Sequence, residues 1–229
     1  MTPAPALLSF LPVLLRGAAV TLEVTAASAC VAFLLAILVG VARVSRAAAL
    51  RTIAKVYIEI LRGTSALIQL YYLFFILPLL GIETTPMEAA ALGLGLTFSA
   101  YGAEIVRAGI QGVDPGQWDA ARALGMPHSL AFRRVIAPQA FASMLAPFGN
   151  LLVELLKSTS LVSLITLTDL TFSGAQVITS TGQPGQTWGA VLLLYFLMCF
   201  PLAQAVRSLE KRFTVYRGPS GASNVRRLA

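Results

Sequence analysis

Long apolar stretches constrain this chain more than any other feature. Residues 17–42 consist almost entirely of Ala, Val, Leu and Ile, and Glu23 is their one charged side chain. A helix of about 20 apolar residues crosses the hydrocarbon core of a bilayer, so this stretch predicts a membrane span. The whole chain agrees, because only 12% of its 229 residues are charged and its mean hydropathy is +0.78. Soluble domains carry roughly twice that charged fraction.

Five stretches are predicted to span the membrane: residues 17–42, 66–80, 87–106, 136–156 and 188–206. We therefore expect an all-α membrane protein of about five transmembrane helices. Pro138 and Pro147 fit the fourth span, because neighbouring helices and water can satisfy the carbonyls that proline leaves free. Residues 161–167 are apolar but short, which predicts a half-helix or a re-entrant segment. Residues 173–187 are rich in Ser, Thr, Gly and Gln and predict an exposed loop.

The distribution of basic residues predicts the orientation of the chain. Lys and Arg follow the first, third and fifth spans, whereas residues 81–86 and the loop before the fifth span carry none. Excess Lys and Arg marks the cytoplasmic side, so the N-terminus should lie outside and the C-terminus inside. The net charge of +7 is thereby explained without a nucleic-acid partner. Residues 1–16 are expected to be an N-terminal extension without a cleaved signal peptide, residues 17–212 the membrane domain, and residues 213–229 a cytoplasmic tail.

A polar insert at residues 111–134 separates the third and fourth spans. Asp114 and Pro115 are typical of a helix start, since Asp caps free amides and Pro suits the first helical position. Residues 119–124 continue with good helix formers, and Gly125 is a typical end in the left-handed conformation. The pattern predicts a short surface helix on the basic side of the membrane. It could be a rigid lever for a cytoplasmic partner or an ordinary solvated connector.

The insert resembles the EAA loop of ATP-binding-cassette import permeases, Glu-Ala-Ala, three residues, Gly, nine residues, Ile-x-Leu-Pro. Every spacing matches, with Asp for Glu, Val for Ile and Ala for Leu; the matching positions are Asp119, Ala120, Ala121, Gly125 and Pro138. Residues 59–69, 100–110, 116–117 and 157–161 resemble the polar amino acid branch of that family, which adds Gln117 to the coupling set. The resemblance covers about residues 15–215. Residues 152–172 and 195–212 look most like permeases for ectoine and hydroxyectoine.

The resemblance implies a subunit of a bacterial inner-membrane importer. Two permease subunits, identical or paralogous, would face each other, two cytoplasmic ATPase subunits would dock below them, and an extracytoplasmic binding protein would deliver a polar amino acid or an ectoine-like zwitterion. The predicted short helix would sit in a cleft of the ATPase. This chain has no Gly-x-x-x-x-Gly-Lys-Ser/Thr sequence, so ATP is expected on the partner subunit and no cofactor is expected here.

Ionisable side chains inside spans are candidate pathway residues, because burying them in a membrane is costly. Two sets stand out: Tyr101, Glu104 and Arg107 in the third span, and Asn150, Glu154, Lys157 and Ser158 in the fourth. A zwitterionic solute needs both a carboxylate and a cation. Alternatively, each Glu and its basic neighbour form an intrahelical ion pair, or snorkel to the interface. A metal site is not expected, since His128 is the only histidine.

Two other functional classes remain possible from the residues alone. An intramembrane enzyme would need a convergent catalytic set, and neither a His-Glu-x-x-His nor a Gly-x-Ser-x-Gly sequence is present. A membrane scaffold without a pathway would not need the intramembrane charges. Small residues at Gly95, Ser99 and Ala103 form a stripe that favours close packing, either within one bundle or across a dimer seam.

Overall fold

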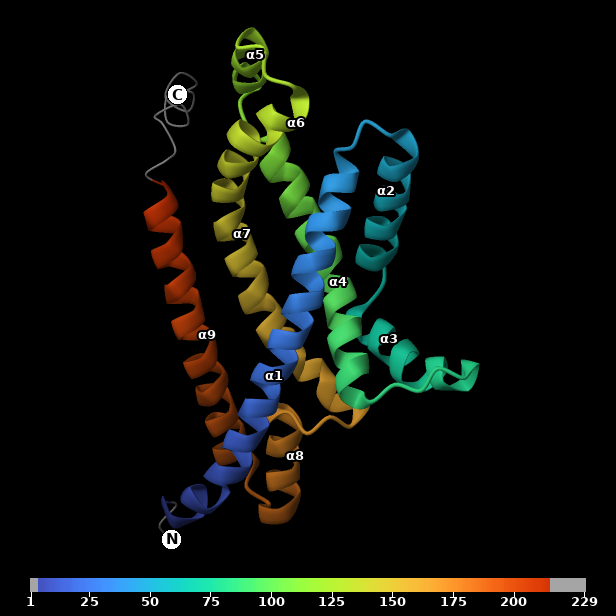
Figure 1. Cartoon of the computed structure of the whole chain (residues 1–229). Helices are drawn as coiled ribbons and strands as arrows, with labels where there is room; N and C mark the ends of the chain where they lie inside the picture. The colour runs from blue at the N-terminus through green and yellow to red at the C-terminus, as the bar shows by residue number, and fades with distance from the viewer. Residues whose placement is uncertain (1–3, 215–229) are drawn as a thin grey trace, which may run out of the picture.

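The computed structural model describes residues 4–214, with side chains over residues 10–209. Within that range every regular element is a helix, which confirms the predicted class. Four helices provide apolar stretches long enough to cross a membrane: α1 Ala4–Arg43, α4 Pro86–Gln111, α7 Ala137–Ser158 and α9 Pro184–Thr214. Helix α2, Ala48–Gly63, and the bent segment Ala66–Leu80, which begins with α3, Ala66–Tyr71, make a fifth if the pair counts as one span. Figure 1 shows these helices as an elongated bundle with α5 at one end and α8 near the other.

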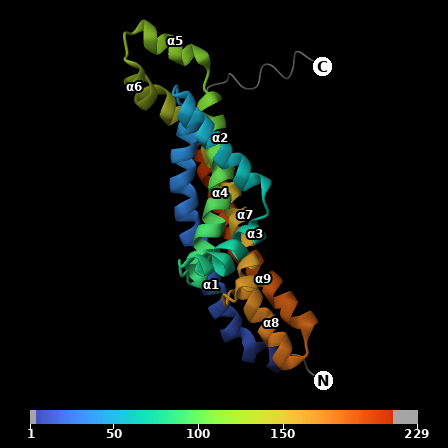
Figure 2. The same cartoon turned by 90° about the vertical axis from the view of Figure 1, so that its right-hand side faces the viewer.

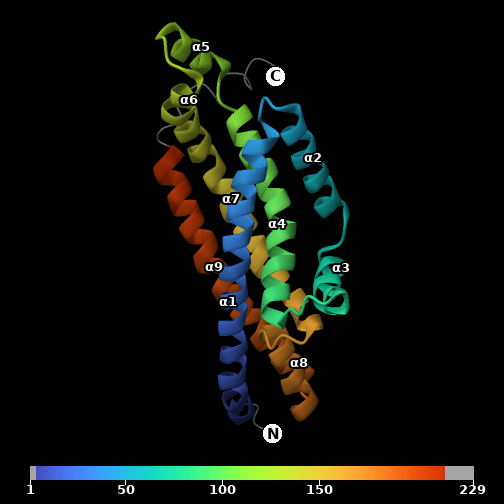
Figure 3. The ribbon, with the colours of Figure 1, turned by 45° about the vertical axis from the view of Figure 1, so that its right-hand side comes forward.

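Helices α1 and α4 run side by side through the bundle and form its central seam (Figure 3). Small residues allow this approach: a Cβ added at Gly95 would lie 2.7 Å from Val31 Cγ1, and one at Gly102 would lie 2.7 Å from Ala36 Cβ. A Cβ added at Gly40 of α1 would lie 2.5 Å from Val106 Cβ and 2.8 Å from the Ala103 carbonyl oxygen of α4. The stripe of small residues therefore serves packing within one bundle, the first of the two predicted alternatives.

The predicted second span at residues 66–80 is not one straight helix. Helix α3 ends at Tyr71 and is followed by a π-helical turn, Tyr72–Ile76, and a 3-10 helix, Leu77–Leu80. The membrane-crossing element is the pair of α2 and this segment, bent by 99° at the break after Gly63. Gln69 holds the break, because its amide donates to the Leu61 carbonyl at 2.9 Å and to Thr64 Oγ1 at 2.7 Å. A broken helix in a membrane needs such partners for its freed backbone groups.

The predicted loop at residues 173–187 is also wrong. The segment after α7 forms a 3-10 helix, Thr159–Ile165, which is the short helix predicted near residues 161–167, and then α8, Leu170–Thr181. Asp169 starts α8 by accepting hydrogen bonds from the Thr171 and Phe172 amides at 3.1 and 2.9 Å. Ser173 and Gly174 are buried, so the small polar residues that suggested a loop are packing positions instead. A Cβ at Gly174 would lie 2.8 Å from Val191 of α9.

The long helices exceed their predicted bounds at both ends of the chain. Helix α1 begins at Ala4 rather than near residue 17, since Leu14 is buried with Leu170, Val177 and Val191 of α8 and α9. The boundary expected after residue 16 therefore lies inside α1. Helix α9 ends at Thr214, and the rest of the predicted tail at 213–229 lies outside the described residues. The start of α1 and the end of α9 lie at opposite ends of the bundle, as an odd number of crossings requires (Figure 1).

Candidate coupling site and transport pathway

The predicted surface helix in the insert is α5, Pro115–Ala123, which projects with α6, His128–Ala131, from one end of the bundle (Figure 2). Asp114 caps it, accepting a hydrogen bond from the Gly116 amide at 2.7 Å. At the other end Gly125 has φ +71°, its amide donates to the Arg122 carbonyl at 2.9 Å, and the Met126 amide donates to the Ala121 carbonyl at 3.0 Å. This pair of bonds is the Schellman motif that closes a helix through a left-handed glycine.

Helix α5 is seated on the bundle through a few side chains. Ala121 is 2% exposed, and Trp118 packs against a cluster that includes Val113, Ile136 and Met144. The Trp118 ring stacks on His128 with 4.7 Å between ring centroids. A helix of nine residues is marginal in isolation, so these contacts and the two caps are what keep it formed.

The motif residues divide between the seat and the open surface. Gln117, Asp119, Ala120 and Gly125 are exposed, whereas Ala121 faces the bundle and is not available to a partner. Asp119 pairs with Arg122 at 2.6 Å on the open face. Gln139 Nε2 donates to Gln117 Oε1 at 3.2 Å and so connects α5 to the first turn of α7.

Pro138 lies exposed in that first turn of α7, directly after a π-helical turn, Phe132–Ile136. The Ala137 amide donates to the Phe132 carbonyl, five residues back. Proline has no N–H and its ring crowds the preceding turn, so the wider turn accommodates it without ending the helix.

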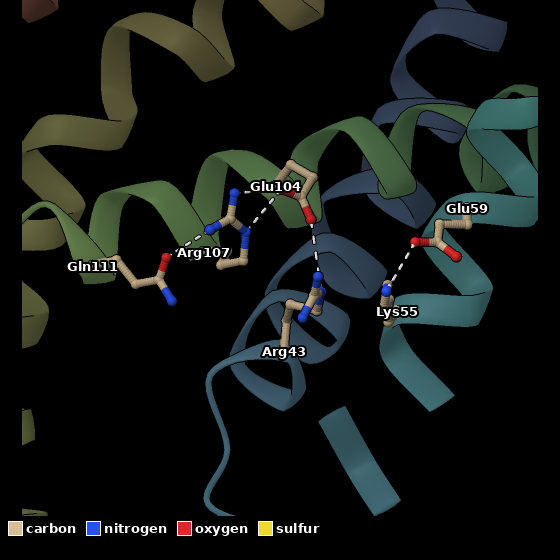
Figure 4. Close-up of polar contacts among 6 residues, drawn as sticks. All are labelled: Arg43, Lys55, Glu59, Glu104, Arg107 and Gln111. Atoms are coloured by element: carbon tan, nitrogen blue, oxygen red, sulfur yellow. Dashed lines mark hydrogen bonds and ion pairs between the residues drawn. The ribbon is translucent and has the colours of Figure 1, made fainter. Parts of the chain in front are cut away.

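The predicted charged pair in α4 is present as an ion pair. Arg107 contacts Glu104 at 2.7 Å and also donates to Gln111 Oε1 at 2.6 Å. Arg43 at the end of α1 approaches the same carboxylate at 3.9 Å, and Figure 4 shows both arginines converging on Glu104. Both partners of Arg107 lie on α4, while Arg43 joins α1 to it. This geometry agrees with the ion-pair alternative for Glu104 and Arg107.

The predicted pair in α7 is not an ion pair. Glu154 and Lys157 are both exposed, and no salt bridge joins them among the described side chains. Asn150 is exposed and Ser158 is half-buried on the same continuous helix. Lys157 lines a groove of about 530 Å³ against α9, beside Tyr195 and Cys199. Both sets start in the middle of the bundle, where a Cβ at Gly102 would lie 3.1 Å from Phe148, and from there the α4 set runs toward α5 while the α7 set runs away from it. Among the described side chains no ion pair joins the two sets.

Arg62 adds a side chain to the α4 set. Its guanidinium lies over the ring of Tyr101, 5.1 Å from the centroid, at the break between α2 and α3. Tyr101 is 39% exposed, so the pair borders an open face of the chain. Arg62 belongs to the Glu-x-x-Arg-Gly-Thr sequence at residues 59–64. That sequence supported the family resemblance, but it did not predict a contact between Arg62 and Tyr101. Gln69 of the same segment accepts a hydrogen bond from Thr97 at 2.7 Å, which fixes the break to α4.

Asp169 is a further carboxylate that the predicted sets omit. It is fully buried, and burial raises the pKa of its carboxyl above the ordinary value, while the Phe172 and Thr171 amides act in the opposite direction. Tyr195 of α9 donates to it at 3.4 Å, and the Leu170 amide donates to Thr21 of α1 at 3.1 Å. These contacts join α1, α8 and α9. An Asp before an apolar run is a helix-start signal that could have located α8.

Comparison with known proteins decides what kind of bundle this is. The family described as "Binding-protein-dependent transport system inner membrane component" matches residues 32–215. The chain belongs to this family. It is a multi-pass inner-membrane permease component of an ABC importer, and such components have no ATPase site of their own. The alternatives of an intramembrane enzyme and of a non-transporting scaffold are therefore wrong.

Individual relatives cover nearly the whole permease. The probable amino-acid ABC transporter permease protein y4tF of Sinorhizobium fredii is 41% identical over 209 residues, which cover 89% of this chain and 88% of the relative. The L-cystine transport system permease protein TcyB of Bacillus subtilis is 34% identical over 210 residues, covering 91% and 89%. The crystal structure of an amino acid ABC transporter with histidines has a TM-score of 0.87 at 32% identity, covering 93% of this chain and 99% of that one. The MetNI methionine ABC transporter, at 20% identity and a TM-score of 0.79, shows the shared fold.

Family membership also implies the partners in outline. A permease of this family works with an ATPase subunit, a solute-binding protein and a second permease subunit. The identity of the solute and the residues that touch each partner are matters of proposal.

Proposed function

We propose that this permease imports a polar amino acid or an ectoine-like zwitterion, with its N-terminus outside, its C-terminus inside and α5 docked in a cleft of the cytoplasmic ATPase. The observation that carries the proposal is α5 itself. It is capped at both ends, seated by Ala121 and Trp118, and placed where the basic loops gather. A rigid element of this kind is what a rocking motion of the ATPase needs in order to move the bundle.

The exposed surface of α5 defines the proposed contact. Gln117, Asp119 and Ala120 are exposed, so they can enter a partner cleft without displacing Ala121 from its seat, although Gln117 also accepts a hydrogen bond from Gln139 of α7. The Asp119–Arg122 pair presents both charges on that surface. Gly125 and Pro138 act on the contact indirectly, Gly125 by closing α5 and Pro138 by shaping the start of α7.

Cross-linking tests the docking. In a background with Cys30→Ser and Cys199→Ser, which removes both cysteines, Ala120→Cys should cross-link to the ATPase subunit in a nucleotide-dependent way. Gly185→Cys, at the start of α9 and remote from α5, is the matched control and should give no product. No cross-link from Ala120→Cys under any nucleotide condition would sink the docking proposal.

The proposed pathway runs along the open faces of α4 and α7. Glu154 and Lys157 are exposed and unpaired with each other, which leaves a carboxylate and a cation free for the two charges of a zwitterion. Asn150 and Ser158 add hydrogen-bonding groups to the same helix. Tyr101, with Arg62 over its ring, would line the pathway nearer the ATPase, and the paired Glu104 and Arg107 would bound it there.

Two measurements test the pathway and the solute. Glu154→Gln should lower uptake into proteoliposomes while leaving assembly with the ATPase intact, and unchanged uptake removes Glu154 from the pathway. The relatives are named for solutes such as L-cystine and glutamine. Calorimetry of the cognate binding protein against polar amino acids and ectoines identifies the solute, and binding of neither class contradicts the proposed cargo.

A further inference from the structure

A pocket of about 350 Å³ lies where the loop between α1 and α2 meets the end of α4 and the start of α5. Its polar lining comes from Arg43, Ser45, Arg51 and Gln111, and Trp118 of α5 forms part of the wall. Two stretches that are distant in sequence, residues 43–51 and 110–118, thus share one cavity. It contains none of the proposed pathway residues.

The pocket has more positive charge than its carboxylates neutralise. Arg43 Nε is buried and has no hydrogen-bond partner among the described residues, and the nearest carboxylate, Glu104, is 3.9 Å away. Glu104 is already held by Arg107 at 2.7 Å. The other nearby carboxylate, Asp114, accepts the Gly116 amide as the cap of α5.

Arg51 is also weakly engaged. Its guanidinium donates only to the Ser45 carbonyl, at 3.5 Å, and the side chain is exposed. Two guanidinium groups therefore line one cavity whose lining contains no carboxylate, and the nearest one, Glu104, reaches only Arg43 and is shared with Arg107. Guanidinium groups prefer oxyanions that accept two parallel N–H bonds, and phosphate is such an anion.

The helix that carries Arg51 also exposes apolar side chains. Leu50 and Ile53, on the first turns of amphipathic α2 and on the faces beside that of Arg51, are 51% and 68% exposed. An inorganic phosphate ion would gain nothing from that surface, whereas the acyl chains of a lipid would cover it. Basic pockets between helices on the cytoplasmic side are suited to lipid head groups.

We propose that this pocket binds the phosphate of an anionic phospholipid of the cytoplasmic leaflet, with Arg43 and Arg51 as its ligands and the acyl chains against Leu50 and Ile53. The bound phosphate supplies the missing acceptor for Arg43. It also joins the hinge between α1 and α2 to Trp118 of α5, so the lipid stabilises the base on which the coupling helix is seated.

Native mass spectrometry of the assembled importer tests the proposal. Phosphatidylglycerol and phosphatidylcholine are titrated into wild type, Arg51→Gln, Arg43→Gln and Arg46→Gln. Each arginine near a membrane surface contributes enough that losing one should weaken phosphatidylglycerol retention about fivefold. Arg46 is exposed in the same loop but does not line the pocket, so Arg46→Gln is the charge-matched control and should retain the lipid like wild type. Arg43→Gln also perturbs Glu104, so Arg51→Gln decides.

A fluorescence arm separates the sources of phosphate. Trp118 and Trp188 are the two tryptophans, so Trp188→Phe leaves Trp118 as the single reporter inside the pocket. Phosphatidylglycerol in phosphatidylcholine nanodiscs should shift the Trp118 emission, and inorganic phosphate should not. An equal shift with inorganic phosphate overturns the lipid proposal in favour of a soluble anion.

Two other outcomes also overturn it. Equal losses in Arg46→Gln and Arg51→Gln would mean diffuse attraction without a pocket. Retention of phosphatidylglycerol by the permease without its ATPase but not by the assembled importer would assign the arginines to the ATPase contact. Both outcomes leave the cross-linking test of α5 docking unaffected.

Discussion

The glycine that closes α5 allows the sharpest test of the coupling proposal. Gly125 has φ +71°, and a Cβ added there would meet no atom within 4 Å. Gly125→Ala therefore introduces no clash, and its whole cost comes from placing an L side chain in the left-handed region. That cost is about 1–2 kcal/mol, which shifts the balance between a closed and a frayed helix end about 5–30-fold.

This penalty should destabilise α5 and leave the rest of the bundle unchanged. Helix α5 has nine residues and depends on its caps, so the penalty frays its last turn, which holds Ala121 in its seat. The rest of the bundle does not depend on Gly125, so thermal unfolding of the permease should hardly change. Uptake per ATP hydrolysed, measured in proteoliposomes with the ATPase and the binding protein, should fall severalfold.

The chain offers matched controls for this test. Gly185→Ala is the same substitution at a position that has no neighbour within 4 Å and no positive φ, so it should behave like wild type. The uptake per ATP of Gly125→Asn should lie between those of Gly125→Ala and Gly185→Ala, because Asn tolerates the left-handed region better than Ala does. If Gly125→Ala and Gly185→Ala give the same uptake per ATP, the closed end of α5 is not needed for coupling and the reasoning is refuted.

Three further predictions concern the bundle. Gly95→Ala places a Cβ 2.7 Å from Val31 and should lower stability by about 1–3 kcal/mol in thermal unfolding, whereas Gly189→Ala, with open space around it, should not. Glu104→Gln leaves Arg43 and Arg107 without their carboxylate and should lower stability by about 1–3 kcal/mol. Lys55→Gln, which removes an exposed pair with Glu59, should change stability by less than about 1 kcal/mol. Equal effects of the two substitutions would contradict the assigned role of Glu104. Asp169→Ala removes the α8 cap and should cost about 1 kcal/mol or more, and Asp169→Asn should restore most of it. Because burial raises the pKa of the Asp169 carboxyl, wild type should gain stability relative to Asp169→Asn as pH falls through that raised pKa, and an opposite slope would contradict the assignment.

The sequence predicts the elements whose signals are local. The run at 17–42 exceeds what a bilayer requires, so the existence of α1 and its end at Arg43 were predicted, although its start was not. Helix α5 is marked at both ends by Asp114, Pro115 and Gly125 and was predicted close to its observed bounds. The motif spacing behind Gly125 identified the family for the same reason, since it depends on residue order rather than on packing.

The elements that were missed depend on distant partners. Ser173 and Gly174 resemble loop residues until α1 and α9 pack against them, as a Cβ at Gly17 would lie 2.5 Å from Ser173 Oγ. The break after Gly63 is held by Gln69, a residue inside the expected span. The contact between Arg62 and Tyr101 joins two helices, so neither local sequence announces it.

The connections of α5 explain how one short helix could act on the whole pathway. A short link that includes Gly112 and Val113 joins α5 to the end of α4. On its other side α6 and a π-helical turn join α5 to the start of α7. These two helices carry every predicted pathway residue: Tyr101, Glu104 and Arg107 on α4, and Asn150, Glu154, Lys157 and Ser158 on α7. They also pack directly, with Gly102 against Phe148. A displacement of α5 therefore moves both helices together, and the pathway should open by rotation of this unit against the neighbouring permease subunit rather than by separation of α4 from α7. Cross-linking cysteines introduced at Gly102 and Phe148 with a short bifunctional thiol reagent should accordingly leave uptake at the level of the same double variant before cross-linking, whose activity already includes the crowding of Gly102→Cys against Ala36. Loss of uptake on cross-linking would show that the two helices must part.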